Sequence, residues 1–167
     1  MIGAENIALS GRSGSGKTQI ADYLVEKHGY TRCSSGAACR EICKKLFGTD
    51  SKAILNRVTD ALKAVDPDVW LRAALSSAPS DRPVVFDSMR FSTDYAFLKG
   101  RGFLTWRIEA PHNVRLDRMR ERHQEVMPED DEHRAETELD QQVFDQIIDN
   151  SEAGLALLYS KIELALS

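Results

Sequence analysis

Short apolar runs alternate with longer stretches of helical periodicity along this chain, a pattern typical of repeated βα units. The apolar runs predict strands over residues 6–10, 30–33, 83–87, 103–109 and 144–149. The periodic stretches predict helices over residues 16–28, 36–47, 52–65, 68–77, 93–99, 114–124 and 152–166. Strands that alternate with helices form parallel sheets covered on both faces. We therefore expect a three-layer α/β fold, with about five mostly parallel strands flanked by helices.

Length and composition fit one compact domain. The chain has 167 residues, of which 42% are hydrophobic and 29% are charged, as is typical of a globular protein. Its net charge of −4 argues against a dedicated nucleic-acid binder, whose domain is usually strongly basic. No apolar run approaches the roughly 20 residues of a membrane span. Residues 1–18 lack the pattern of a secretory signal, so we expect a cytoplasmic protein.

A phosphate-binding loop follows the first predicted strand. Residues 11–18 read GRSGSGKT and match the pattern G-x-x-x-x-G-K-[ST] in full. Its glycines let backbone N–H groups turn inward around phosphate oxygens, and the helix that follows presents its positive end. Lys17 can reach the β- and γ-phosphates, and the Thr18 hydroxyl can bind Mg²⁺. The motif predicts a nucleoside triphosphate site made by Gly11, Ser13, Gly14, Ser15, Gly16, Lys17 and Thr18.

Charged residues elsewhere narrow the class of protein. Asp87 ends the third strand, where its carboxylate could hold the Mg²⁺ hydration shell or activate an acceptor hydroxyl, and Arg90 would project toward bound phosphate. Residues 115–122 carry four arginines, whose guanidinium groups suit a transferring phosphoryl group on a flap that excludes water. The guanine-reading segment N-K-x-D is absent from the sequence, and the chain is short for a ring ATPase. These features favour a small-molecule kinase.

Five stretches, in order along nearly the whole chain, resemble the P-loop nucleoside monophosphate kinases. They read GRSGSGKT, SSGAACREICKKLFG, VDPDVWLRAAL, VVFDSMRF, and DEHRAETEL together with IIDNS. The likeness is greatest to the phage-type deoxynucleoside monophosphate kinases, which are similar to dephospho-coenzyme A kinases. Ser92-Thr93-Asp94 replaces the usual Pro–Asn–Glu of that family, and Ala135 stands where a serine is frequent. These differences concern the acceptor more than the reaction.

The resemblance implies a role for each matching position. Arg40 would lie in the region that receives the acceptor's monophosphate, and Trp70 would belong to the acceptor-side helices. Asp87 and Arg90 would lie at the acceptor site, where the family has Asp–Gly–Val–Arg–Tyr/Phe. The remaining matches are Arg118 and Arg122 in the flap, Glu136 and Glu138 where a His–x–Ser–Glu element is common, and Asn150 in a loop near the adenine. Of the two glutamates, we assign Glu136 to the substrate.

We therefore predict an enzyme that uses ATP and Mg²⁺ to phosphorylate a (deoxy)nucleoside monophosphate to the diphosphate. Its predicted catalytic residues are Lys17, Asp87, Arg90, Arg118 and Arg122, and its predicted Mg²⁺ ligands are Thr18 and Asp87. One domain would span residues 1–167, with an acceptor-binding helical insertion over about 35–77 and an arginine-rich flap over about 115–135.

Alternatives stay open at this point. The acceptor could be dephospho-coenzyme A or another small molecule, or the chain could be a non-catalytic ATP-sensing module. A kinase of nucleic-acid ends is disfavoured by the acidic charge. The C-terminal helix presents an apolar face that would cover the sheet and could in part serve a homodimer contact. A phage-encoded enzyme would work in the host cytoplasm.

Overall fold

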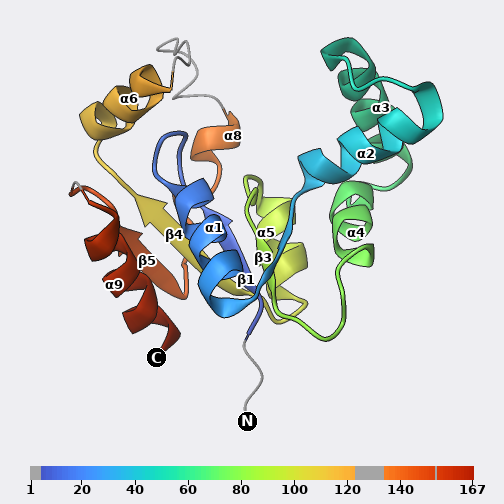
Figure 1. Cartoon of the computed structure of the whole chain (residues 1–167). Coiled ribbons are helices and arrows are strands. Elements are labelled where there is room, and N and C mark those ends of the chain that lie inside the picture. Colours follow the sequence, from blue (N-terminus) through green and yellow to red (C-terminus); the bar gives the residue numbers. More distant parts are fainter. Residues whose placement is uncertain (1–4, 123–133, 153) are drawn as a thin grey trace.

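The structure, a computed structural model, describes residues 5–122, 134–152 and 154–167 (Figure 1). Its strands are β1 (Ile7–Ser10), β2 (Thr31–Cys33), β3 (Val84–Phe86), β4 (Leu104–Glu109) and β5 (Gln146–Asp149). The helices of the described residues are α1 (Lys17–His28), α2 (Ser35–Phe47), α3 (Lys52–Val65), α4 (Val69–Ser76), α5 (Ser92–Lys99), α6 (His112–Glu121), α8 (Arg134–Thr137) and α9 (Leu155–Leu166). The predicted α/β fold class is confirmed. The sequence pattern does not predict α8, and residues 123–133 of the predicted flap lie outside the described residues.

The strands form one five-stranded sheet in the order β2-β3-β1-β4-β5, and every pair is parallel. β1 is central, because Ile7 is in register with Val85 of β3 on one side and with Leu104 of β4 on the other. The carboxyl ends of the strands therefore meet at one edge of the sheet. The phosphate-binding loop leaves β1 there, at the point where the chain switches from one side of β1 to the other, which is where open α/β sheets bind ligands.

Helices cover both faces of the sheet, as its nearly continuous apolar strands predict. Ile7, Leu9 and Trp106 pack on one face in a core that also contains residues of α1 and α9 (Figure 1). Ala8 and Phe86 pack on the other face with residues of α4 and α5. Successive side chains of a strand point to opposite faces, so β1 contributes to both layers and is buried along its whole length.

Helices α2, α3 and α4 form a smaller unit beside the sheet (Figure 1). The core of this helical unit contains Cys39, Cys43 and Trp70, all buried. α2 begins after Ser34, whose hydroxyl accepts a hydrogen bond from the N–H of Ala37 at 3.1 Å, a standard N-cap. α3 has no fully buried residue, so it lies on the outside of the unit. The helical unit occupies the residues where the acceptor-binding insertion is predicted.

Helix α9 packs on the sheet through Leu158 and Ile162 and exposes Leu155, Leu157 and Leu164. A homodimer contact through this exposed face stays a prediction. None of the helices in the described ranges is long and apolar enough to cross a membrane.

Candidate functional site

The phosphate-binding loop is shaped by glycines that no other residue could replace without strain. Gly11 has φ +143°, and a Cβ placed on it would lie 2.4 Å from the carbonyl oxygen of Ile108. Gly16 has φ +108°, and its Cβ would lie 2.4 Å from Nδ2 of Asn150. Gly16 is also the residue before α1, which begins without a side-chain cap. The first N–H groups of α1 are therefore available to an anion, as at other phosphate-binding helix ends.

Asn150 binds the backbone of the phosphate-binding loop. Its side-chain Nδ2 donates to the carbonyl oxygen of Ser15 at 2.8 Å, and its backbone N–H donates to the carbonyl oxygen of Glu109 at 2.7 Å. The side chain is buried, so these bonds are shielded from water. The resemblance places Asn150 near the adenine; in the structure its amide group binds the loop backbone and supports the phosphate site from the end of β5.

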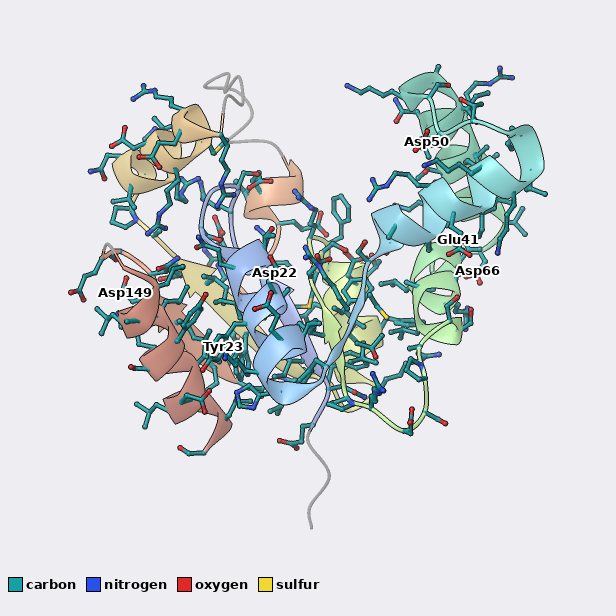
Figure 2. All side chains as sticks on the ribbon, viewed as in Figure 1. Asp22, Tyr23, Glu41, Asp50, Asp66 and Asp149 are labelled. Carbon is teal, nitrogen blue, oxygen red and sulfur yellow. The ribbon has the colours of Figure 1, made fainter. Side chains whose placement is uncertain are left out.

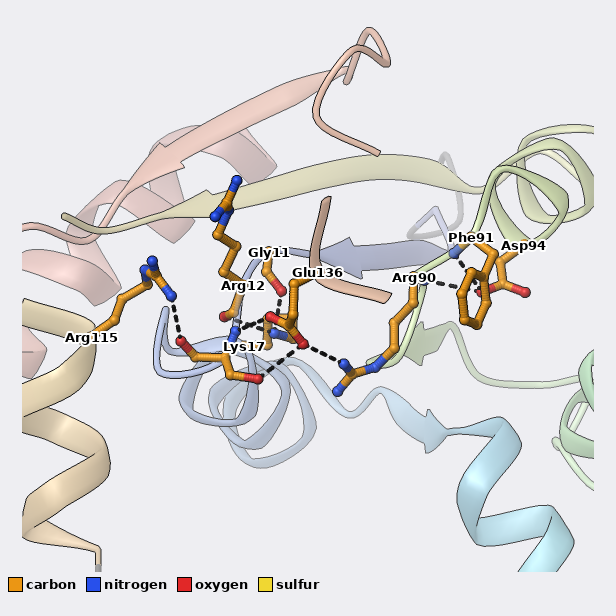
Figure 3. Close-up of polar contacts among 9 residues, drawn as sticks. Gly11, Arg12, Lys17, Arg90, Phe91, Asp94, Arg115 and Glu136 are labelled. Atoms are coloured by element: carbon orange, nitrogen blue, oxygen red, sulfur yellow. Dashed lines mark hydrogen bonds and ion pairs between the residues drawn. The ribbon is translucent and has the colours of Figure 1, made fainter. Parts of the chain in front are cut away.

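Lys17 points back across the mouth of the loop (Figure 3). Its ammonium group donates to the carbonyl oxygens of Gly11 and, at 3.1 Å, of Arg12. Burial, together with the positive charge of Arg90, lowers its pKa from 10.5 to about 8, although the Glu136 carboxylate opposes the shift. A phosphate group bound at the loop would place negative charge beside this desolvated cation and would favour its protonated form.

A cavity of about 540 Å³ extends from the loop to the helical unit. It brings together most of the predicted site residues, namely Ser13, Gly14, Gly16, Lys17, Thr18, Arg40, Trp70, Asp87, Arg90 and Arg122. Five cations line it, Lys17, Arg40, Lys63, Arg90 and Arg122, against the two carboxylates Asp87 and Asp94. The cavity therefore suits an anionic ligand.

The helical end of the cavity contains residues that sequence reasoning missed. Lys63 of α3 lies 5.4 Å from the centre of the Phe91 ring, a cation–π contact. The Ser88 hydroxyl oxygen is buried at the cavity wall without a hydrogen-bond partner among the described residues. Neither residue gave a motif signal, because Lys63 is one of several charged residues on a predicted helix and Ser88 stands between Asp87 and Arg90 without a predicted role of its own. Trp70, predicted on the acceptor side, lies on α4 and lines the cavity. It is almost wholly buried, and its indole N–H donates to the Thr59 carbonyl at 3.4 Å.

Glu136 connects the loop with Arg90 (Figure 3). Its carboxylate accepts hydrogen bonds from the N–H of Ser13 at 2.5 Å, from the Ser13 hydroxyl at 3.0 Å and from Arg90 at 2.7 Å. The side chain is 7% exposed. Glu136 is predicted to bind substrate, but it does not line the cavity. Its carboxylate instead accepts hydrogen bonds from the donors that a phosphate group would use.

The arginines of α6 point to different places. Arg122 lines the main cavity, as predicted for a flap arginine. Arg118, also predicted beside the phosphates, donates to the carbonyl oxygen of Asn150 at 2.8 Å and lines a second hollow of about 520 Å³ with Gln19 and Leu155. Arg115 is buried and donates to the carbonyl oxygen of Ser13 at 3.2 Å. The arginines of this cluster are therefore divided among the loop, the second hollow and the main cavity.

The residues present fit a magnesium ion that is shared with a nucleotide. Thr18 and Asp87 line the same cavity and offer hard oxygen donors. Within the described residues no group of three His, Cys, Asp or Glu side chains could hold a metal ion alone. Mg²⁺ commonly takes one or two protein ligands and completes its coordination shell with phosphates and water. The two oxygen donors of this site agree with that preference.

A parallel sheet whose central strand runs through a phosphate-binding loop into a helix, with a cationic cavity beside it, defines a P-loop nucleotide-binding protein. The chain belongs to the AAA domain family, whose model matches residues 7–139.

Solved structures of kinases share the fold. A gluconokinase from Sinorhizobium meliloti 1021 is similar with a TM-score of 0.63 and 22% identity, over 98% of this chain and 91% of that one. A shikimate kinase from Acinetobacter baumannii, in complex with shikimate, is similar with a TM-score of 0.61 and 19% identity, over 97% of this chain and 93% of that one. These likenesses support a P-loop kinase fold and leave the phage-type deoxynucleoside monophosphate kinase as a prediction.

One relative among the curated proteins is "Uncharacterized protein ORF76" of Ictalurid herpesvirus 1 (strain Auburn). It is 28% identical over 115 residues, which is 63% of this chain. The chain spans 48% of the length of that protein.

Proposed function

We propose that this protein is a kinase that transfers the γ-phosphoryl group of ATP to a (deoxy)nucleoside monophosphate and forms the diphosphate. The observation that carries the proposal is that one continuous cavity joins the phosphate-binding loop to the helical unit. Its five cations, set against two carboxylates, suit two phosphate-bearing substrates held side by side. A polyol acceptor without a phosphate would leave part of this charge unused.

The two ends of the cavity have different roles in this proposal. The loop and the start of α1 bind the triphosphate, with Lys17 at the β- and γ-phosphates. Arg40 and Lys63 bind the monophosphate of the acceptor, and Arg90 and Arg122 stabilise the charge of the group in transfer. Thr18 and Asp87 would hold Mg²⁺, which would neutralise negative charge on the phosphate oxygens. A monophosphate oxygen is already ionised near neutral pH, so positioning and charge suffice and no general base is needed.

A hydroxyl acceptor is the second candidate, because the fold is also that of a gluconokinase and a shikimate kinase. A hydroxyl must lose its proton during transfer. In that case Asp87 would be the carboxylate of the cavity that accepts the proton. Arg32 lies 2.5 Å from Oδ2 of Asp87, so this oxygen is already engaged by a guanidinium group and is not free to contact an acceptor hydroxyl. This contact favours the monophosphate acceptor.

The first test is a coupled assay of ADP release with ATP and Mg²⁺. The acceptors are each ribo- and deoxyribonucleoside monophosphate, dephospho-coenzyme A, gluconate and shikimate. We expect release with one or more monophosphates, and we expect Lys17→Met to lower kcat by about 100-fold or more, the usual cost of losing one strong charge donor. Lys99→Met, which removes a lysine of α5 outside the cavity, should leave the rate unchanged.

Two results would contradict the proposal in different ways. Release with gluconate, shikimate or dephospho-coenzyme A alone would keep the kinase and replace its acceptor. No release with any acceptor, while ATP still binds, would reject the enzyme and leave the ATP-sensing module.

A further inference from the structure

Arg32 of β2 binds the carboxylate of Asp87 from outside the cavity. Its Nε and one terminal nitrogen each lie 2.5 Å from Oδ2 of Asp87. β2 and β3 are parallel neighbours with Arg32 in register with Val85. Asp87 follows Val85 by two residues, so the side chains of Arg32 and Asp87 lie on the same face of the sheet. Arg32 does not line the cavity, whereas Asp87 does. Arg32 therefore touches the site only through Asp87.

The geometry of this contact fixes one oxygen of the carboxylate. Both guanidinium nitrogens meet Oδ2, and Oδ1 lies outside the contact with Arg32. The Asp87 side chain is only 12% exposed and that of Arg32 is 36% exposed, so the pair is better shielded than an ordinary surface ion pair. A planar guanidinium that binds one oxygen through two N–H groups restricts the position of that oxygen more than a single ammonium could.

Arg32 is itself held by the helix that follows the phosphate-binding loop. Its other terminal nitrogen lies 2.7 Å from Oδ1 of Asp22, which projects from α1 (Figure 2). α1 begins at Lys17 and Thr18. The chain of contacts Asp22–Arg32–Asp87 therefore joins the helix that carries Thr18 to the strand end that carries Asp87. These contacts link the two elements that carry the oxygen donors expected to hold Mg²⁺.

We propose that Arg32 is a positioning residue that sets the orientation of Asp87 toward the Mg²⁺ hydration shell. The proposal rests on the proposed function, because it needs Asp87 to serve a metal ion shared with ATP. Groups that orient a metal ligand from outside typically contribute about 10- to 100-fold to metal affinity or activity. Orientation and charge make opposite predictions here. If Arg32 acted only through its charge, its loss would leave Asp87 more attractive to a cation and would tighten metal binding.

The test compares Arg32→Met and Arg32→Lys with wild type. Arg101→Met is the matched control, because Arg101 stacks on Phe97 at 3.7 Å, in the turn after α5, outside the cavity. The first measurement is the affinity of Mn²⁺ for the protein–ATP complex, followed by electron paramagnetic resonance of free Mn²⁺. The second is the affinity for ATP without metal, and the third is kcat and KM with the accepted monophosphate.

For Arg32→Met we expect the Mn²⁺ affinity and kcat each to fall about 10-fold or more. The metal-free affinity for ATP should stay within about twofold, because Arg32 does not touch the loop. Arg32→Lys keeps the charge but loses the two-pronged contact, so it should fall between Arg32→Met and wild type. If Arg32→Met does not fold, as judged by its thermal transition, Arg32→Lys carries the same test. Arg101→Met should match wild type throughout.

Unchanged or tighter Mn²⁺ binding in both Arg32 variants would overturn the proposal, as would an effect confined to the KM of the acceptor. Failure of the proposed function gives a different result. Wild type would then show no turnover with any acceptor, and the Mn²⁺ titration with ATP would still decide whether Arg32 orients Asp87.

Discussion

At the scale of single residues, the buried charge of Lys17 links ligand binding to pH. Burial lowers its pKa from 10.5 to about 8. Between these two pH values the unfolded chain binds more protons at this position than the folded protein, so stability rises with pH through the window. Below pH 8 the folded protein holds a desolvated cation, which costs on the order of 3 kcal/mol relative to solvent. A bound phosphate offsets this cost by pairing with the cation.

ATP binding should therefore weaken above pH 8. ATP needs the protonated ammonium, so its affinity should be flat from about pH 7 to 8 and then fall by up to about tenfold per pH unit. Calorimetric titration with ATP at pH 7.0, 8.0, 9.0 and 9.5 measures this profile. Lys17→Met should bind ATP more weakly and show no loss above pH 8. A wild-type affinity that stays constant to pH 9.5 would show that another group supplies the charge.

At the scale of elements, α8 places a carboxylate where the nucleotide's terminal phosphate should bind. The carboxylate of Glu136 in α8 accepts hydrogen bonds from the N–H and the hydroxyl of Ser13 and from a guanidinium nitrogen of Arg90. These are the kinds of donor that bind a γ-phosphate. A carboxylate and a phosphate at one position repel each other, so Glu136 must give up some of these bonds when ATP binds.

Glu136→Gln should accordingly bind ATP more tightly than wild type, by roughly three- to tenfold, because an uncharged amide repels phosphate less. ADP lacks the terminal phosphate, so its affinity should change by less than about twofold. Titration of both nucleotides separates the two effects. Glu138→Gln is the matched control, because Glu138 accepts a bond from the N–H of Ser92 at 2.8 Å and lies just beyond α8. Equal tightening of ATP and ADP, or weaker ATP binding, would contradict this role for Glu136.

The same element shows how far a sequence can predict this site. The phosphate-binding loop is continuous in the chain, so its residues and their spacing predict its place between β1 and α1. Asp87 and Arg90 are also close in sequence, at the end of a recognisable strand. The partners of Glu136 lie 123 and 46 residues away, and no periodicity links them. The prediction that Arg118 lies at the phosphates has a similar limit. A cluster of arginines in the sequence predicts a charged helix but not the direction of each side chain.

At the scale of the whole molecule, the sequence predicts the strands better than their order. β2 and β5 are the edges of the sheet, and each carries polar or exposed residues. β1 and β3 are both buried throughout, so their sequences do not reveal which of them is central. Strand order and the position of the helical unit together create the cavity. Whether that unit and the sheet behave as one cooperative body decides how the two substrate sites are coupled.

Two tryptophans report on the two parts. Trp106 is fully buried in the core beneath α1 and α9, and Trp70 is buried in the core of the helical unit. α4 joins the two parts, because Leu71 and Ala74, on the same helix as Trp70, pack against the second face of the sheet. A helix that shares two cores cannot leave one without disturbing the other. We therefore expect the helical unit and the sheet to unfold together.

The variant Trp106→Phe tests this, because Trp70 is then the remaining tryptophan. Its urea transition by fluorescence should coincide with the transition of the same variant by far-ultraviolet circular dichroism, the mark of two-state unfolding. The substitution should cost about 1–3 kcal/mol in lost packing, reduced because the buried indole nitrogen of Trp106 has no hydrogen-bond partner among the described residues. Trp70→Phe gives the reciprocal experiment. A fluorescence midpoint of Trp70 at clearly lower urea would mean that the helical unit opens by itself, so that acceptor binding would have to order it first.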